Sequence, residues 1–236
     1  MSDSAAKIAD NLVRVRERMA NAAVRASRRP EEVQLVAVTK YVGPAEAAAL
    51  LTAGCPLLGE SRPQQLWDKA AEPSLADARW HMIGHLQRNK VRRTLPLVEL
   101  IHSVDSLRLV KSIDHVASEL DTRMRVLLEV NCSGDVEKHG LTADGLKELL
   151  PQLATFSHVE VCGLMTMAAR EGDDRVAAEN FAALRQLRDA VRGECPPQVR
   201  LTELSMGMSH DFEIAIREGA TIVRIGSLLF EGIVSR

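Results

Sequence analysis

The chain has 236 residues, enough for one large domain or two small ones, and its 46% apolar content can supply a sizeable core. Its 30 basic residues nearly balance its 32 acidic ones, which argues against a general nucleic-acid or anionic-membrane surface. The four cysteines are scattered, with no CxxC pair, and suggest neither a metal site nor a disulfide framework, so we expect a cytoplasmic protein. No apolar run approaches the roughly 18 residues of a membrane helix.

The chain begins with apolar residues at helical spacing, and short apolar segments then alternate with segments of helical pattern. Ile8, Leu12, Val15 and Met19 fall on one face of a helix predicted over 4–27. The predicted strands are 33–38, 55–59, 79–84, 97–104, 124–131, 159–165, 201–207 and 220–227. The helices predicted between them are 43–54, 62–77, 87–96, 105–120, 142–156, 174–193 and 209–219.

Eight strands separated mostly by helices predict a single (β/α)8 TIM-type barrel with an extra N-terminal helix. Several strands are apolar on both faces, as expected of a parallel sheet covered by helices. An open doubly wound sheet is the alternative. No linker, low-complexity segment or repeat interrupts the pattern, so we expect one domain over 1–236. Asp105 and Ser209 are the predicted N-caps of the helices that they open.

The seventh and eighth predicted strands run into two turns rich in glycine and serine, "SMGMS" and "RIGS". In such barrels the functional site lies at the carboxyl ends of the strands, often with a phosphate site after strands seven and eight. Backbone N–H groups and hydroxyls in these turns suit a phosphate cradle. The alternative is that the glycines make tight turns and the serines cap helices. The cradle residues are Ser205, Gly207, Ser209, Gly226 and Ser227.

Two basic residues lie in or at the end of predicted strands, on the side of the barrel where the site is expected. Arg224 lies in an apolar strand, and alternation places it inside the barrel. It either forms an ion pair with a buried carboxylate such as Glu129 or Glu203, or contacts a ligand below the cradle. Lys40 ends the first strand. It is a lysine reaching solvent, a cation for an anionic ligand, or an amine that forms a Schiff base with an aldehyde. An aldehyde with a phosphate tail describes pyridoxal 5′-phosphate.

Several motifs together resemble the pyridoxal-phosphate homeostasis protein family. They are "VAVTK", "WHMIGHLQRNK", "HSVDS", "GLMTM" and "SMGMSHDFEIAIREGATIVRIGSLLF", and the resemblance runs from about Val33 to Phe230. The "SMGMS…RIG" segment is the most specific of them, whereas "VTK" alone is weak. The resemblance implies a barrel similar to the N-terminal domain of alanine racemase.

The resemblance also implies roles for individual residues. Lys40 matches the lysine that holds pyridoxal phosphate as a Schiff base, and Arg224 matches the arginine that faces the pyridine nitrogen. The first phosphate turn corresponds to Ser205, Met206, Gly207 and Ser209, and the second to Gly226 and Ser227, where the family often has threonine instead of Ser227.

The sequence departs from the family at Ser61, where many relatives have asparagine, so any cofactor contact of that asparagine is in doubt here. His81 and Asn89-Lys90 lie in a family motif whose chemical role the sequence does not reveal. The basic run 87–93 is either a solvated helix face or a surface that docks a partner or free cofactor.

The residues favour a carrier over an enzyme. Pyridoxal phosphate draws electrons most strongly when its ring nitrogen is protonated, and a cationic Arg224 at that nitrogen disfavours the proton. Alanine racemases take a second acid/base from a tyrosine in a C-terminal β-domain. This chain ends soon after the eighth strand, and its only tyrosine, Tyr41, is predicted to point away from the mouth. His81, His85 and His210 are substitutes by residue type alone.

We therefore expect a monomeric protein that holds pyridoxal phosphate, passes it to apo-enzymes and serves vitamin B6 homeostasis, with no catalytic residue established. The first alternative is a low-activity amino-acid racemase. The second is a barrel that binds a phosphorylated metabolite without an imine.

Overall fold

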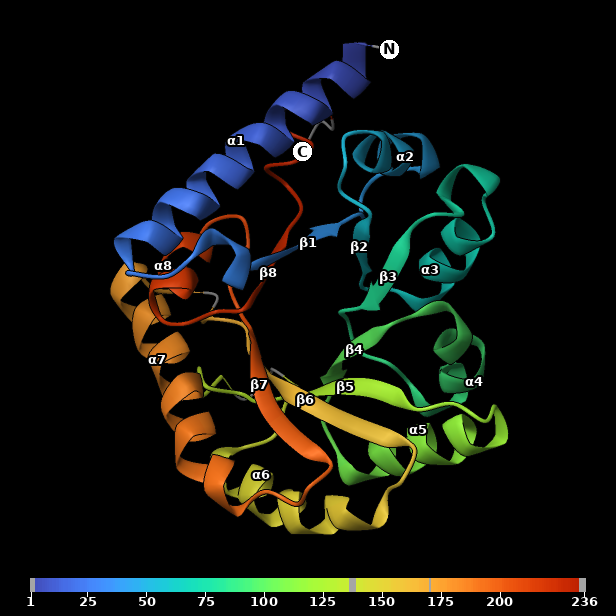
Figure 1. Ribbon diagram of the computed structural model, residues 1–236, viewed down its shortest axis with the longest axis vertical. Helices are drawn as coiled ribbons and strands as arrows, with labels where there is room; N and C mark the ends of the chain where they lie inside the picture. Colours follow the sequence, from blue (N-terminus) through green and yellow to red (C-terminus); the bar gives the residue numbers. More distant parts are fainter. Residues whose placement is uncertain (1–2, 136–138, 170, 234–236) are drawn as a thin grey trace.

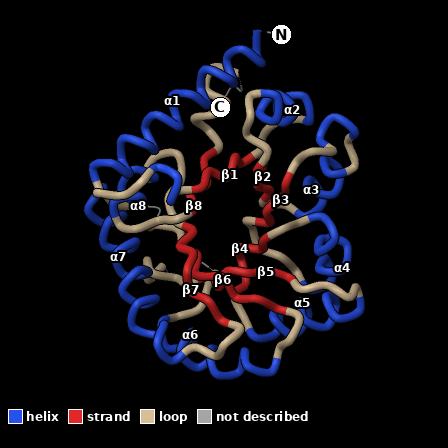
Figure 2. Tube along the Cα trace, viewed as in Figure 1, coloured by secondary structure: helices blue, strands red, loops and turns tan. Residues whose placement is uncertain are grey.

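The computed structural model describes residues 3–135, 139–169 and 171–233, and its strands form a closed barrel (Figures 1 and 2). All neighbouring strands pair in parallel, and β8 pairs back onto β1 with Val36 opposite Arg224. The predicted (β/α)8 barrel is confirmed, and the open sheet is wrong. The strands are β1 Gln34–Val38, β2 Leu57–Glu60, β3 Arg79–Met82, β4 Leu100–Val104, β5 Met124–Glu129, β6 Val159–Met165, β7 Val199–Ser205 and β8 Ile222–Ile225.

The helices lie outside the ring of strands (Figure 2). The predicted helices 62–77 and 142–156 stop well before their predicted ends, because Pro73 and Pro151 cannot donate the backbone hydrogen bond that an α-helix needs at those points. A 3-10 turn, η5, continues from Leu150 to Thr155 where the α-helix stops. The α-helices are α1 Asp3–Arg25, α2 Pro44–Thr52, α3 Pro63–Ala70, α4 Val91–Thr94, α5 Leu107–Glu119, α6 Ala143–Leu149, α7 Asp174–Val191 and α8 Phe212–Arg217.

The extra helix α1 covers the place where a helix after β8 would lie. It packs between α8 and α2, while residues 227–233 after β8 form turns (Figure 1). The amide of Asn11 donates a hydrogen bond of 3.1 Å to the carbonyl of Leu229, which fixes these turns against the helix. The apolar stripe predicted on α1 is buried and consists of Ile8, Leu12, Val15 and Met19.

The core has two parts. A large apolar cluster fills the space between the sheet and the helices. A smaller one lies apart from it and comprises Val36, Leu57, Leu100, Leu127, Cys162, Met165 and Ile222, all from strands. Buried polar side chains, among them His81, His102, Ser205 and Arg224, also come from strands of the barrel. In the part of the chain that is described, no helix is long and apolar enough to cross a membrane.

Both predicted N-caps are wrong by a small shift of the helix start. Ser106 caps α5, and its hydroxyl accepts a hydrogen bond of 3.4 Å from the Leu109 N–H. Asp105 is therefore not used as the cap. At α8 the first helical residue is Phe212, so Asp211 takes the cap position instead of Ser209. Each of these segments offers more than one polar residue near the helix start, and sequence alone does not select among them.

Candidate functional site

Lys40 lies two residues beyond β1, at the carboxyl end of the barrel. Its side chain is half-buried, and its Nζ lies 4.7 Å from the centroid of the Tyr41 ring. Tyr41 is 73% exposed, so this contact is a surface cation–π interaction that still leaves the amine accessible. Lys40 therefore lies at the mouth of the barrel, and no carboxylate among the described residues pairs with it.

A buried ion pair supports the residue before Lys40. The Lys69 ammonium donates hydrogen bonds of 2.5 Å to Glu60 Oε1 and of 2.6 Å to the carbonyl of Thr39. The Thr39 hydroxyl donates to the same carboxylate oxygen over 2.7 Å. All three side chains are buried, so the backbone that carries Lys40 is held by charge-assisted hydrogen bonds.

The turn after β7 requires glycine at its centre. Gly207 has a φ of +90°, a conformation that residues with a side chain rarely adopt. A Cβ atom at this position would lie 2.5 Å from Cβ of Ala215 in α8. The turn therefore lies directly against the helix that follows it, with its backbone unobstructed by a side chain at Gly207.

The turns after β7 and β8 are joined to each other. The backbone N–H of Arg224 donates to the carbonyl of Gly207 over 3.0 Å, and the backbone N–H of Gly226 donates to the Ser209 hydroxyl over 3.3 Å. A Cβ on Gly226 would lie 3.1 Å from the carbonyl of Val38, so this turn closely approaches the end of β1. Ser209 thus links two turns instead of capping a helix. The structure brings together the residues predicted for the cradle, with Ser227 exposed at its edge.

Arg224 is 4% exposed and is held by neutral partners. Its guanidinium donates to Ser205 Oγ over 2.5 Å and to the carbonyl of Thr166 over 3.0 Å. Among the described residues no carboxylate lies within ion-pair distance of it, so the alternative of an ion pair with Glu129 or Glu203 is wrong. Burial lowers the pKa of Arg224 to about 10, against the opposing effect of Glu129. The side chain remains a cation at neutral pH.

A chain of hydrogen bonds continues from Arg224 into the barrel. Ser205 Oγ lies 2.8 Å from His102 Nδ1, and His102 Nε2 lies 2.9 Å from His81 Nδ1. Burial lowers the pKa of His81 to about 4 and that of His102 well below its usual value, so both rings are neutral at pH 7. The Ser205 hydroxyl accepts from the guanidinium, which leaves its proton to donate to His102. His102 then donates from Nε2 to His81.

Sequence reasoning missed His102 and left His81 without a role. Alternation along β4 was the available signal, because it places His102 on the same interior side as Leu100. His81 is 3% exposed and lies too deep to meet a substrate at the mouth. Of the three histidines considered as a second acid/base, His85 and His210 are the exposed ones.

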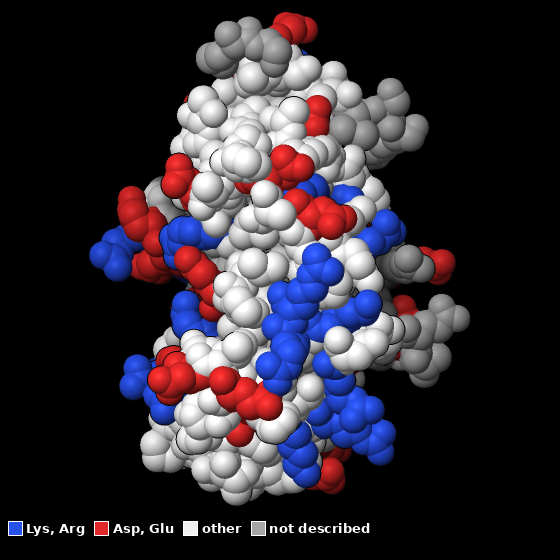
Figure 3. All heavy atoms as spheres, turned by 90° about the vertical axis from the view of Figure 1, so that its right-hand side faces the viewer, with Lys and Arg blue, Asp and Glu red and all other residues white. Residues whose placement is uncertain are grey.

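The basic run 87–93 forms η3 (Arg88–Lys90) and the start of α4. Basic side chains gather on the face of the barrel that Figure 3 presents. Part of this charge is engaged, since Arg92 pairs with Glu119 and Arg93 lies 4.2 Å from the centroid of the Trp67 ring. These contacts are those of an ordinary helix surface, and docking of a partner here stays a prediction.

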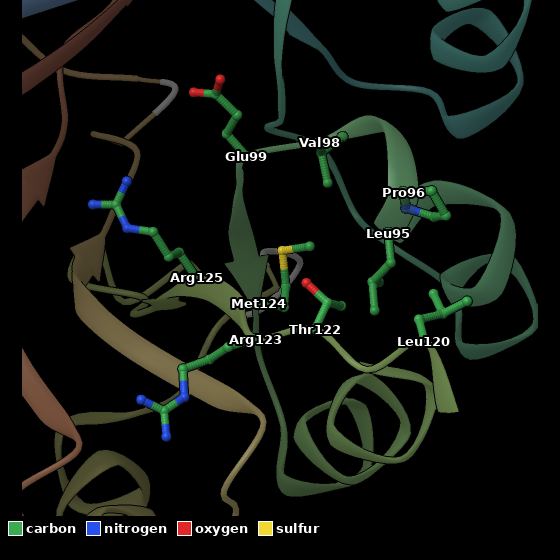
Figure 4. Close-up of a pocket in the computed structure, with 9 residues that line it drawn as sticks. All are labelled: Leu95, Pro96, Val98, Glu99, Leu120, Thr122, Arg123, Met124 and Arg125. Atoms are coloured by element: carbon green, nitrogen blue, oxygen red, sulfur yellow. The ribbon is translucent and has the colours of Figure 1, made fainter. Parts of the chain in front are cut away.

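Two hollows lie away from the cradle. A groove of about 560 Å³ opens at the amino ends of β4 and β5, with Glu99 and Arg125 among its lining residues (Figure 4). It lies at the opposite end of the barrel from Lys40. A smaller hollow of about 190 Å³ lies on the mouth side and is lined in part by Ser61 and His85.

The fold and the geometry of the strand ends define the class of barrel to which this chain belongs. The chain belongs to the barrels represented by the N-terminal domain of alanine racemase, whose sequence model matches residues 5–233. Alanine racemase of Clostridium difficile shares the fold, with a TM-score of 0.72 at 16% identity, and this chain covers 58% of its length.

Within that class, the chain belongs to the pyridoxal phosphate homeostasis protein family. The family member from Aquifex aeolicus is 40% identical over 221 residues, which cover 94% of this chain and 96% of the relative. PipY of Synechococcus elongatus, solved with PLP bound, has a TM-score of 0.84 and 36% identity, with 94% of this chain and 99% of that one covered. A protein from Bifidobacterium adolescentis has a TM-score of 0.91 at 36% identity, with 97% and 96% covered.

Proposed function

We propose that this protein binds pyridoxal 5′-phosphate and holds it on Lys40 as a Schiff base, as a carrier in vitamin B6 homeostasis. The observation that carries the proposal is the closure of the barrel. It sets an accessible lysine after β1 beside the joined glycine turns after β7 and β8 and beside the buried Arg224. The PLP-bound relative and the name of the family add support.

The residues present fit this cofactor. The turns at Gly207 and Gly226 have no side chain over their backbone, and Ser209 and Ser227 add hydroxyls for a phosphate. Ser205 belongs to the same site, with its hydroxyl bonded to Arg224 and His102. In this proposal Met206 also belongs to the phosphate turn. Lys40 supplies the amine for the aldehyde, and Arg224 faces the pyridine nitrogen.

Arg224 also supports a carrier over an enzyme. The bound cofactor would supply an electron sink whose strength depends on a proton at the ring nitrogen. Arg224 is cationic at neutral pH and its partners are neutral acceptors, so it disfavours a second positive charge at that nitrogen. The site therefore suits reversible capture of an aldehyde better than amino-acid chemistry. In the same proposal the protein acts as a cytoplasmic monomer that delivers the cofactor to apo-enzymes.

The test is borohydride reduction of the cofactor-supplied protein, followed by peptide mass mapping. We expect one pyridoxyl-phosphate group on the peptide that contains Lys40, together with a visible absorbance band before reduction. Lys40→Ala should lose both signals. Lys147→Ala is the matched control, because Lys147 is an exposed lysine on α6 that pairs with Asp144, and it should keep both. Modification spread over many lysines, or none at Lys40, would contradict the Schiff-base proposal.

An amino-acid racemase assay on the same loaded protein then separates carrier from enzyme. The carrier proposal expects no turnover above that of free pyridoxal phosphate, together with transfer of the cofactor to an apo-enzyme. Turnover that disappears in Lys40→Ala would instead establish the racemase alternative. If no cofactor binds at all, the cradle should be screened with phosphorylated metabolites.

A further inference from the structure

Three potential metal ligands converge on the mouth side of the barrel, outside the proposed cofactor site. His85 follows β3, Asp105 directly follows β4, and His139 precedes α6 in the connection from β5. Each offers one ligand atom, and these atoms all lie within 4.8 Å of one another. His85 Nδ1 is 3.3 Å from Asp105 Oδ2, and the His85 and His139 rings stack with centroids 4.5 Å apart. From these residues we propose a binding site for one divalent transition-metal ion, of which Zn²⁺ is the best match.

The ligand types select the metal. Two imidazole nitrogens and one carboxylate oxygen suit Zn²⁺ and its neighbours Co²⁺ and Ni²⁺, whereas Ca²⁺ and Mg²⁺ prefer oxygen ligands alone. Three protein ligands also leave an open position for water or another ligand. The cluster therefore has the composition of an open zinc site, since no fourth protein ligand joins the three among the described residues.

The geometry needs only side-chain movement. Zinc–ligand bonds of roughly 2.0–2.1 Å place the ligand atoms of a tetrahedral site about 3.4 Å apart. The His85–Asp105 pair already has that spacing. His139 is exposed, so its ring is free to turn towards the other two, which would replace the stack by a shared ion.

The helix that follows Asp105 does not explain why a carboxylate stands at this position. Asp105 occupies a position that sequence assigns to helix capping, but Ser106 performs that role. The Asp105 side chain is only 15% exposed, and its one ion-pair contact among the described residues is with His85. A partly buried carboxylate beside two imidazoles favours a cation held between them. Bound metal would tie together the loops after β3, β4 and β5 at the mouth.

The test is titration of chelator-treated protein with Co²⁺, followed by competition with Zn²⁺. We expect one Co²⁺ per chain, with visible d–d bands and no sulfur-to-cobalt charge-transfer band, which excludes the four cysteines as ligands. His85→Asn, Asp105→Asn and His139→Asn should each weaken binding by about 100-fold or more, because loss of even an outer partner costs 10–100-fold. Circular dichroism and the thermal unfolding midpoint verify that each variant is folded.

His115→Asn is the matched control for surface histidines. The side chain of His115 is 74% exposed and lies 3.8 Å from Glu119 in α5, so it tests whether any exposed histidine beside a carboxylate holds the ion. This variant should keep the wild-type affinity, and Zn²⁺ should raise the unfolding midpoint of wild type but not of His85→Asn. The proposal is overturned if wild type binds no Co²⁺, if Asp105→Asn binds as tightly as wild type, or if His115→Asn loses the ion.

Discussion

The ammonium of Lys69 and the carboxylate of Glu60 form a buried ion pair of 2.5 Å, and both also contact Thr39. The Glu60 side chain is fully buried and that of Lys69 is 8% exposed. The second oxygen of Glu60 is buried and has no hydrogen-bond partner within the described part of the chain. The pair therefore depends on one shared oxygen, and it holds Thr39, the residue directly before Lys40, where the proposed Schiff base forms.

We expect Lys69→Met to lower the free energy of unfolding by about 3–5 kcal/mol, because it leaves the Glu60 charge buried and unpaired. Glu60→Gln in the same chain should restore most of the loss by removing that charge. Urea unfolding measures both. Arg175→Met breaks the exposed Arg175–Glu179 pair on α7 and should cost at most about 1 kcal/mol. Equal losses for Lys69→Met and Arg175→Met would show that burial of the pair has no energetic consequence.

His81 should make the protein acid-sensitive. Its folded pKa of about 4 lies below the usual value of 6.5, so between these values the unfolded chain binds the proton and the folded one does not. Stability from this group is therefore complete above pH 6.5, falls by about 3 kcal/mol as the pH drops to 4, and then levels off.

His81→Gln should reduce the loss of unfolding free energy between pH 6.5 and 4 by about that amount, measured by urea unfolding at several pH values. His102, whose pKa is lowered in the same direction, still titrates in this variant. His115→Gln replaces an exposed histidine and should retain the wild-type profile. A wild-type profile in His81→Gln would contradict the buried neutral state assigned to His81.

Gly207→Ala should destabilise the protein and weaken cofactor binding together. Alanine at a φ of +90° costs about 1–3 kcal/mol, and the close contact with Ala215 adds to it. For a chain of this size each kcal/mol lowers the unfolding midpoint by about 2–4 °C. Gly193→Ala is the control, because a Cβ built there has no described residue beyond its two chain neighbours within 4 Å. Thermal scans with and without pyridoxal phosphate measure both effects, and a neutral Gly207→Ala would refute the tight turn.

Ser209→Ala should reduce the preference for pyridoxal phosphate over pyridoxal. The Ser209 hydroxyl accepts from the Gly226 N–H and orients the two turns that we propose as the phosphate site. Loss of one hydrogen bond of about 0.5–1.5 kcal/mol corresponds to roughly 2–12-fold in affinity. The ratio of the two dissociation constants is the measurement. If Ser209→Ala changes the dissociation constant of pyridoxal as much as that of pyridoxal phosphate, Ser209 acts near the ring and not at the phosphate.

Much of this architecture was predictable, because the periodicity of the apolar residues indicates the helices and strands, and the strand ends indicate the site. The order of strands and helices follows from the apolar pattern, and the sites after β1, β7 and β8 follow from the barrel. Caps at Asp105 and Ser209 failed because neighbouring polar residues compete for one position. The hydrogen-bond chain through His102 and the cluster around His85 were not predictable, because each joins residues from several strands or loops that only the closed barrel brings within reach.

The pairing of β1 with β8 has a consequence for the order of events during synthesis. Lys40 emerges from the ribosome early, whereas the two glycine turns are among the last segments to be translated, and chains begin to fold from the N-terminal side. A growing chain thus presents Lys40 as an ordinary surface amine. In the proposed function, the capacity to retain a phosphorylated aldehyde would appear only when the last strand closes the ring, so a nascent or truncated product would have no means of withdrawing cofactor from the cell.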